Sequence, residues 1–271
     1  MEPILDLVAV VYNAPDETEA FLASLNKVDV PFTCTLIDNN SPDPRILSLL
    51  IDWQAQKKPK NMIDRSIIFK EQNVGYARAC NLGASKGKAR YLALLNCDTE
   101  FIYGNTSKII DLFEEDSSIG IIGPLTYGSD GKITHGGIFK DTNSGRDLHR
   151  GWMVDVNIAG DAVKDTCDVP TVSGATYFAR RSMWDELTTC PLYREAAGDS
   201  VEGAFLPTPH FYEETWCSYH ARAHDYRVVY LGSAEMIHQW HRSSPIGSVS
   251  LEPAESMFRD ACKVHGIELT F

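Results

Sequence analysis

Short apolar runs alternate with amphipathic segments along the first half of the chain. Each apolar run is typical of a strand that is buried on both faces of a sheet. Strands that alternate with helices predict a mostly parallel central sheet with helices on both faces, so the expected fold class is α/β. The expected strands are residues 5–12, 32–37, 66–69 and 91–95, and the expected helices are residues 15–26, 46–56 and 74–86.

The pattern becomes less regular in the second half. After a helix at 107–113 and a strand at 119–122, residues 127–164 are rich in Gly, Asp and Asn, which predicts loops and a short hairpin. We expect one domain with two halves, residues 1–125 and 126–271. The further expected strands are 171–178, 227–231 and 234–237. One further helix is expected to start after Arg181, and two others are expected at 211–224 and 253–264.

The apolar run that begins at Tyr91 ends abruptly in Asn96, Cys97 and Asp98. Ligands of open α/β sheets bind beyond the carboxyl ends of the strands, where Asp98 would lie. Carboxylate oxygens suit Mg²⁺ and Mn²⁺, so this stretch predicts a metal ligand at Asp98. The alternative is an ordinary turn in which the Asn and Asp side chains cap backbone groups.

Two common phosphate-binding loops are missing. No G-x-G-x-x-G follows the first expected strand, which argues against a dinucleotide-binding domain. The segment from Gly83 to Ala89 is similar to a P-loop, but three residues rather than four separate its glycines, and it precedes a strand instead of following one.

Composition narrows the class of partner. The 271 residues carry a formal net charge of −12, which disfavours binding to nucleic acid and implies that a cation helps to hold any phosphorylated substrate. The 7 cysteines are scattered and never form a C-x-x-C pair, which argues against a zinc site or a disulfide framework. No basic leader or long apolar stretch is present, so we expect a cytoplasmic protein without a transmembrane segment.

Several motifs, in order, resemble those of the family 2 glycosyltransferases, and in particular the rhamnosyltransferase-like members with their GT-A fold. The similarity extends through nearly the whole chain. Three departures occur: the family's E-D pair is Glu-Glu here, an acidic residue is replaced by Trp216, and a glycine by Asp225. The matching segments are Val10–Asn13, Asp38–Ser41, Asn73–Gly83, Leu94–Asp98, Val172–Ala175, Glu213-Glu214, and His238 with Ser243.

The resemblance implies that a UDP- or dTDP-sugar binds to the first half of the chain. Asp38 could accept a hydrogen bond from the ring N–H of uracil or thymine, and Arg242 could neutralise the diphosphate. The alternatives are turn capping for Asp38 and surface charges for Arg78 and Arg242. The residues that we expect to bind the donor are Tyr12, Asn13, Asp38, Asn73, Gly75, Arg78, Asn96, Arg242 and Ser243.

The same resemblance implies a metal site and a catalytic base. Asp98 matches a D-x-D variant that holds Mn²⁺ or Mg²⁺, and His238 is expected to add a nitrogen ligand. The base is expected in the pair Glu213-Glu214, and counting back from Tyr226 favours Glu214. The alternatives are a core histidine at His238 and a solvated first helical turn at the two glutamates.

The expected function is therefore an inverting, metal-dependent glycosyltransferase that acts on the hydroxyl of a carbohydrate, a lipid-linked glycan or a protein. The first half would bind the donor, and the second half would bind the acceptor and supply the base. Two alternatives stay open. One is a sugar nucleotidylyltransferase, although the Gly-rich basic loop of that class is missing after the first strand. The other is a binding module that has lost turnover, which the substituted E-D pair motivates.

Overall fold

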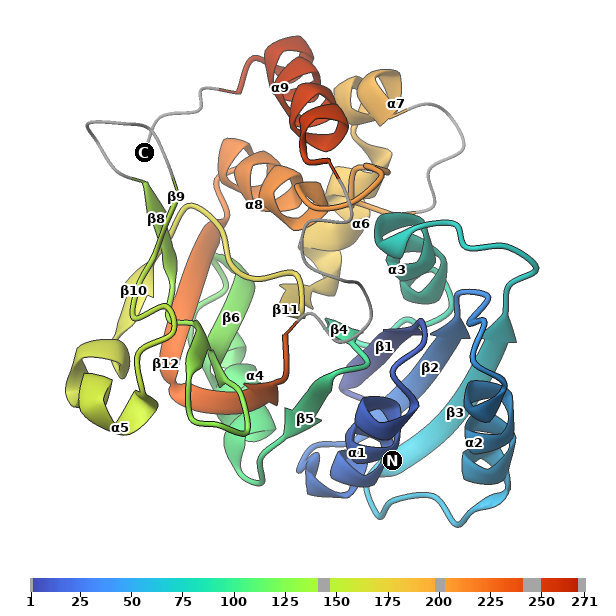
Figure 1. Cartoon of the computed structure of the whole chain (residues 1–271). Coiled ribbons are helices and arrows are strands. Elements are labelled where there is room, and N and C mark those ends of the chain that lie inside the picture. Colours follow the sequence, from blue (N-terminus) through green and yellow to red (C-terminus); the bar gives the residue numbers. More distant parts are fainter. Residues whose placement is uncertain (1, 141–146, 198–202, 241–249, 268–271) are drawn as a thin grey trace.

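The structure is a computed structural model that describes residues 2–140, 147–197, 203–240 and 250–267. A large sheet runs through the centre, with the strand order β10-β12-β6-β11-β4-β1-β2-β3 (Figure 1). Helices cover both of its faces, which confirms the predicted α/β class.

The first half of the chain forms the parallel part of this sheet. Its four neighbouring strands are β1 (Leu5–Val11), β2 (Phe32–Asp38), β3 (Met62–Phe69) and β4 (Tyr91–Asn96). In the register of these strands, Val11 pairs with Asp38 and Val10 pairs with Asn96. Two of the polar strand ends that the sequence predicts therefore lie at one edge of the sheet.

Strand β1 shows why the sheet has two apolar faces. Its side chains alternate, so that Leu5, Leu7, Ala9 and Val11 belong to one buried cluster and Val8 and Val10 to the other. The first cluster is covered by helices α1 (Pro15–Ser24), α2 (Pro44–Ala55) and α4 (Asn105–Glu115), and the second by α3 (Tyr76–Ala84), α6 (Arg181–Thr189) and α8 (Glu213–Ala223). A short 3₁₀ turn, η1 (Leu25–Lys27), follows α1.

The second half adds mixed strands to the sheet. Strand β11 (Thr176–Arg180) runs antiparallel to both β4 and β6 (Ile119–Tyr127), and β12 (Arg227–His238) runs parallel to β6. The two strands expected at 227–231 and 234–237 are one strand, because a register shift between Leu231 and Glu235 absorbs the residues between them. Shorter strands at the periphery are β5 (Thr99–Phe101), β7 (Ile133–His135) and β10 (Thr166–Asp168).

The expected strand at 171–178 was wrong for its first part, since β11 begins only at Thr176. The expected short hairpin is present as β8 (Ile138–Lys140) and β9 (Asp147–His149), and α5 (Val156–Ala159) with the 3₁₀ turn η2 (Gly160–Val163) follows it.

A third apolar cluster joins α8 to α7 (Pro191–Ala197), which the sequence did not predict, and to α9 (Glu252–His265). These helices gather at one end of the molecule (Figure 1). Among the described residues, no helix is both long enough and apolar enough to cross a membrane.

Candidate active site

A cavity of about 440 Å³ opens beside the carboxyl ends of β1 and β4. It brings together side chains from both halves of the chain. Eight of the predicted site residues line it: Tyr12, Asn73, Gly75, Asn96, Asp98, Glu213, Glu214 and His238.

Asp98 and His238 meet at the floor of this cavity. Asp98 lies between β4 and β5, and the antiparallel pairing of β5 with β12 sets Thr99 opposite His238. A hydrogen bond from the backbone N–H of Gln239 to the carbonyl oxygen of Asp98, 2.9 Å long, extends the pairing. As a result, Nε2 of His238 lies 3.5 Å from Oδ1 of Asp98.

This pair suits a divalent cation. Both side chains are buried, with 3% of Asp98 and 5% of His238 exposed. Nδ1 of His238 has no hydrogen-bond partner among the described residues. One carboxylate and one imidazole form a donor set that Mn²⁺ accepts readily, whereas Mg²⁺ prefers oxygen ligands alone.

Glu213 and Glu214 are the first two residues of α8, which begins after Tyr212 in a left-handed conformation with φ 68°. Glu213 accepts a hydrogen bond from the Thr208 hydroxyl, 3.2 Å long, whereas Oε2 of Glu214 is buried with no hydrogen-bond partner among the described residues. Burial raises the pKa of Glu213 to about 7. Burial, and then the charge of Glu213, raise the pKa of Glu214 well above its usual value.

The segment from Ser173 to Ala175, expected as a strand, instead packs against Glu214. A Cβ atom added at Gly174 would lie 3.4 Å from the Glu214 side chain, which is van der Waals contact, so the backbone of this segment lies directly against Glu214. The hydroxyl of Tyr76 donates to the carbonyl oxygen of Gly174 over 2.7 Å and fixes the segment. This stretch of backbone directly precedes β11 and forms part of the cavity wall.

Two asparagines join the loops that follow β2 and β3. The Asn39 amide donates to Oδ1 of Asn73 over 2.9 Å, and its own oxygen accepts the backbone N–H of Val74 over 2.9 Å. Oδ1 of Asn73 also accepts the N–H of Gly75 at 2.9 Å. Gly75 has φ 83°, a conformation that favours glycine, so the predicted glycine is required by the turn that opens α3.

Three predicted donor residues do not line the cavity. Asn13 donates its N–H to the Ser41 hydroxyl over 3.0 Å, and Asp38 accepts the backbone N–H of Ser41 over 3.0 Å. Arg78 is exposed on α3. Arg242 and Ser243 lie outside the described residues. The roles of these five residues, like the roles of the eight that line the cavity, stay predictions.

Sequence reasoning missed His135, His149 and Trp152, which form an aromatic and imidazole wall together with Trp240. Trp152 and Trp240 make an edge contact with ring centroids 4.7 Å apart, and the ring centroids of His149 and Trp152 are 5.4 Å apart. His135 also lines the cavity and is almost fully buried, and this burial lowers its pKa to about 3. Only the loop-rich composition of residues 127–164 indicated a recognition surface here, because loops carry no periodic signal.

Similar folds occur among solved glycosyltransferases. GalNAc-T7 with UDP, GalNAc and Mn²⁺ matches 96% of this chain and 48% of its own length, with a TM-score of 0.68 and 14% identity. Residues 1–349 of S. aureus TarS in complex with UDP match 96% of this chain and 64% of that chain, with a TM-score of 0.59 and 15% identity. The mannosyltransferase PcManGT from Pyrobaculum calidifontis, with GDP-Man and Mn²⁺, matches 92% of this chain and 59% of its own, with a TM-score of 0.57 and 13% identity.

The chain therefore spans about half to two thirds of the length of these three solved chains. A comparison with curated proteins gave no significant match. The family model described as "Glycosyl transferase family 2" matches residues 6–182, which include the Asp98 stretch and the segment from Ser173 to Ala175. Both the predicted family and the predicted fold are thus confirmed: this chain belongs to glycosyl transferase family 2 and has the GT-A fold.

Proposed function

We propose that this protein is an inverting, metal-dependent glycosyltransferase that moves a sugar from a UDP- or dTDP-sugar to an acceptor hydroxyl. The observation that carries the proposal is that one cavity holds both the Asp98–His238 pair and the Glu213–Glu214 pair. A transferase of this kind needs charge compensation at the leaving diphosphate and a base at the attacking hydroxyl. The two pairs meet these two needs.

Asp98 and His238 would hold Mn²⁺ or Mg²⁺. The bound ion would supply positive charge to the departing nucleoside diphosphate. None of the described residues that line the cavity is Lys or Arg, so the protein side chains there offer the diphosphate no fixed cation. The solved structures of GalNAc-T7 and PcManGT, which contain Mn²⁺, support this part of the proposal.

Glu214 is the proposed base that takes the proton of the acceptor hydroxyl. Its Oε2 atom has no hydrogen-bond partner among the described residues, whereas Glu213 is engaged with Thr208. The raised pKa of Glu214 makes its carboxylate a stronger base than an exposed glutamate once the proton has left. Glu213 would act on Glu214 through its charge.

The donor would bind to the half formed by residues 1–125, where Asn39, Asn73 and Asn96 line the cavity. The acceptor would approach the half formed by residues 126–271. There, the faces of Trp152 and Trp240 suit the apolar faces of a sugar ring. Carbohydrates, lipid-linked glycans and proteins are the acceptor classes that we propose.

Incubation with a panel of sugar nucleotides tests the function without knowledge of the acceptor. We expect slow release of UDP or dTDP from one donor when Mn²⁺ or Mg²⁺ is present, and none after chelation. Pyrophosphate release from a nucleoside triphosphate and a sugar phosphate would instead identify a nucleotidylyltransferase. Donor binding without hydrolysis, and without transfer to any of a panel of acceptors, would identify a module that has lost turnover.

A further inference from the structure

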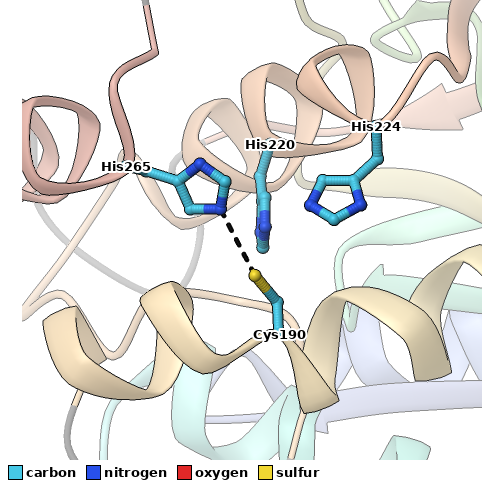
Figure 2. A group of neighbouring side chains, drawn as sticks. All are labelled: Cys190, His220, His224 and His265. Atoms are coloured by element: carbon cyan, nitrogen blue, oxygen red, sulfur yellow. Dashed lines mark hydrogen bonds between the residues drawn. The ribbon is translucent and has the colours of Figure 1, made fainter.

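A second group of potential metal ligands lies apart from the cavity, where the ends of three helices meet (Figure 2). Cys190 directly follows α6, His220 lies in α8, His224 directly follows α8, and His265 is the last residue of α9. One ligand atom from each of the four side chains lies within 4.8 Å of all the others.

The geometry of this group suits a tetrahedral ion. His220 and His224 are separated by one helical turn and therefore project from the same side of α8. Sγ of Cys190 lies 3.4 Å from Nε2 of His265. In a tetrahedral zinc site, Zn–N and Zn–S bonds of about 2.0 and 2.3 Å place neighbouring ligand atoms about 3.3–3.6 Å apart. The observed spacing needs only small side-chain rotations to close around an ion.

His220 lacks the partners that a buried imidazole requires. It has 0% exposed surface, and neither of its ring nitrogens has a hydrogen-bond partner among the described residues. Its surroundings are aromatic, with the rings of Trp216 at 5.0 Å and His265 at 4.4 Å between centroids. A polar group buried in this way is costly unless something binds it, and a metal ion would supply the missing bond.

Glu186 supports the group from outside. Its Oε1 atom lies 2.8 Å from Nδ1 of His224, and the Tyr226 hydroxyl donates to its Oε2 over 2.9 Å. A carboxylate on one ring nitrogen orients the other nitrogen for a metal, a common arrangement behind histidine ligands. One thiolate at Cys190 and one carboxylate at Glu186 would also balance the two charges of a divalent cation.

We propose that Cys190, His220, His224 and His265 form a structural zinc site. A set of three imidazoles and one thiolate, without a carboxylate ligand, selects Zn²⁺ over the Mn²⁺ or Mg²⁺ of the proposed active site. Four protein ligands complete the tetrahedron and leave no open position for a substrate, so the ion stabilises structure rather than taking part in catalysis. It links α9 to the end of α6 and to α8, the helix that begins with Glu213 and Glu214.

The test uses the full chain, purified without chelators, and its metal content. We expect about one Zn²⁺ per chain by mass spectrometry of metals, as for closed structural sites. Exchange for Co²⁺ should give tetrahedral d–d absorption bands and a thiolate-to-cobalt charge-transfer band. Cys190→Ser should remove the charge-transfer band, and His265→Gln should lower zinc content. Cys167→Ser, at another partly buried cysteine, is the matched control and should change neither.

Zinc-free protein that also gives no tetrahedral spectrum with Co²⁺ would overturn the proposal. Retention of the thiolate band in Cys190→Ser would do the same. The variant Asp98→Ala separates the two metal sites, since it should keep its zinc. Loss of zinc in Asp98→Ala, with full zinc in Cys190→Ser, would place the ion in the cavity and refute the second site.

Discussion

His238 lies with its Nε2 atom 3.5 Å from Oδ1 of Asp98, although the two residues come from opposite halves of the chain. The pairing of β5 with β12 creates this relationship, because it fixes Thr99 opposite His238. A ligand of Asp98 therefore approaches His238 as well. The local sequence around Asp98 contains no sign of this second side chain.

The variant Asp98→Ala should abolish metal-dependent nucleotide binding. With UDP at about 100 times its Kd and Mn²⁺ present, the wild-type protein should gain about 2.7 kcal/mol of stability, which corresponds to a rise of about 5–10 °C in Tm. Removal of the carboxylate should eliminate this rise, as should chelation. Thermal unfolding monitored by fluorescence measures the effect.

Asp111→Ala serves as the control, since Asp111 is exposed on α4 and lies away from the cavity. This variant should respond to UDP and Mn²⁺ as the wild-type protein does. An undiminished metal-dependent rise in Asp98→Ala would refute the metal assignment. A rise in the wild-type protein that persists after chelation would show nucleotide binding without a metal.

Glu214→Gln should lower the rate of transfer far more than Glu213→Gln. Loss of a general base costs about 10²- to 10⁴-fold in rate, while Glu213 acts only through its charge on Glu214. The measurement is kcat for transfer once an acceptor is found, and kcat for donor hydrolysis before that. Glu115→Gln, at an exposed glutamate of α4, should keep the wild-type rate. The assignment fails if Glu213→Gln is the slower of the two active-site variants.

The free energy of unfolding should fall as pH rises through the titration of Glu213. Its folded pKa of about 7 lies above its ordinary value of 4.5, because burial disfavours the carboxylate. The contribution of Glu213 to the free energy of unfolding is complete below pH 4.5, where Glu213 is protonated in both the folded and the unfolded protein. It is lost between pH 4.5 and 7, because Glu213 ionises first in the unfolded protein. The loss is on the order of 3 kcal/mol for a shift of this size.

Glu213→Gln removes this contribution together with the effect of the Glu213 charge on Glu214, while the buried histidines titrate alike in both proteins. Urea unfolding at a series of pH values should show the variant gaining stability relative to the wild-type protein between pH 4.5 and 7. A constant difference across that range would mean that Glu213 is not protonated when folded.

The alternating half of the fold was predictable because β1, β2 and β4 are compact apolar runs. Strand β3 lies at the edge of the sheet and mixes polar and apolar residues, so only its last part, residues 66–69, was expected. The ends of those strands also indicated the site, since Asn96 and Asp98 follow the run that forms β4. The glutamates of α8 and His238 required the family resemblance, because a carboxylate pair or a lone histidine has no local pattern that separates function from surface or core. Their convergence depends on long-range strand and helix packing.

The group of Cys190, His220, His224 and His265 shows more sharply what the sequence alone cannot predict. The absence of a C-x-x-C pair argued against zinc, but that inference applies only to sites built from nearby ligands. Cys190 and His265 come from helices far apart in sequence, and only the packing of α9 against α7 and α8 brings them together. Helix packing of this kind leaves no spacing rule in the chain.

Arg181→Met should be among the most destabilising single substitutions in the chain. Its guanidinium donates to Asp6 over 2.9 Å, with only 11% and 5% of the two side chains exposed, and also to the carbonyl oxygen of Ala84 over 2.8 Å. Asp6 in turn accepts the backbone N–H of Ala89 over 2.7 Å, so the pair holds the end of the segment from Gly83 to Ala89, whose sequence is similar to a P-loop. Loss of the arginine leaves Asp6 buried without its charge partner, which costs about 3–5 kcal/mol.

Urea unfolding measures the change, and Arg45→Met, at an exposed pair with Asp43, should cost less than about 1 kcal/mol. Equal losses in the two variants would contradict a structural role for the buried pair.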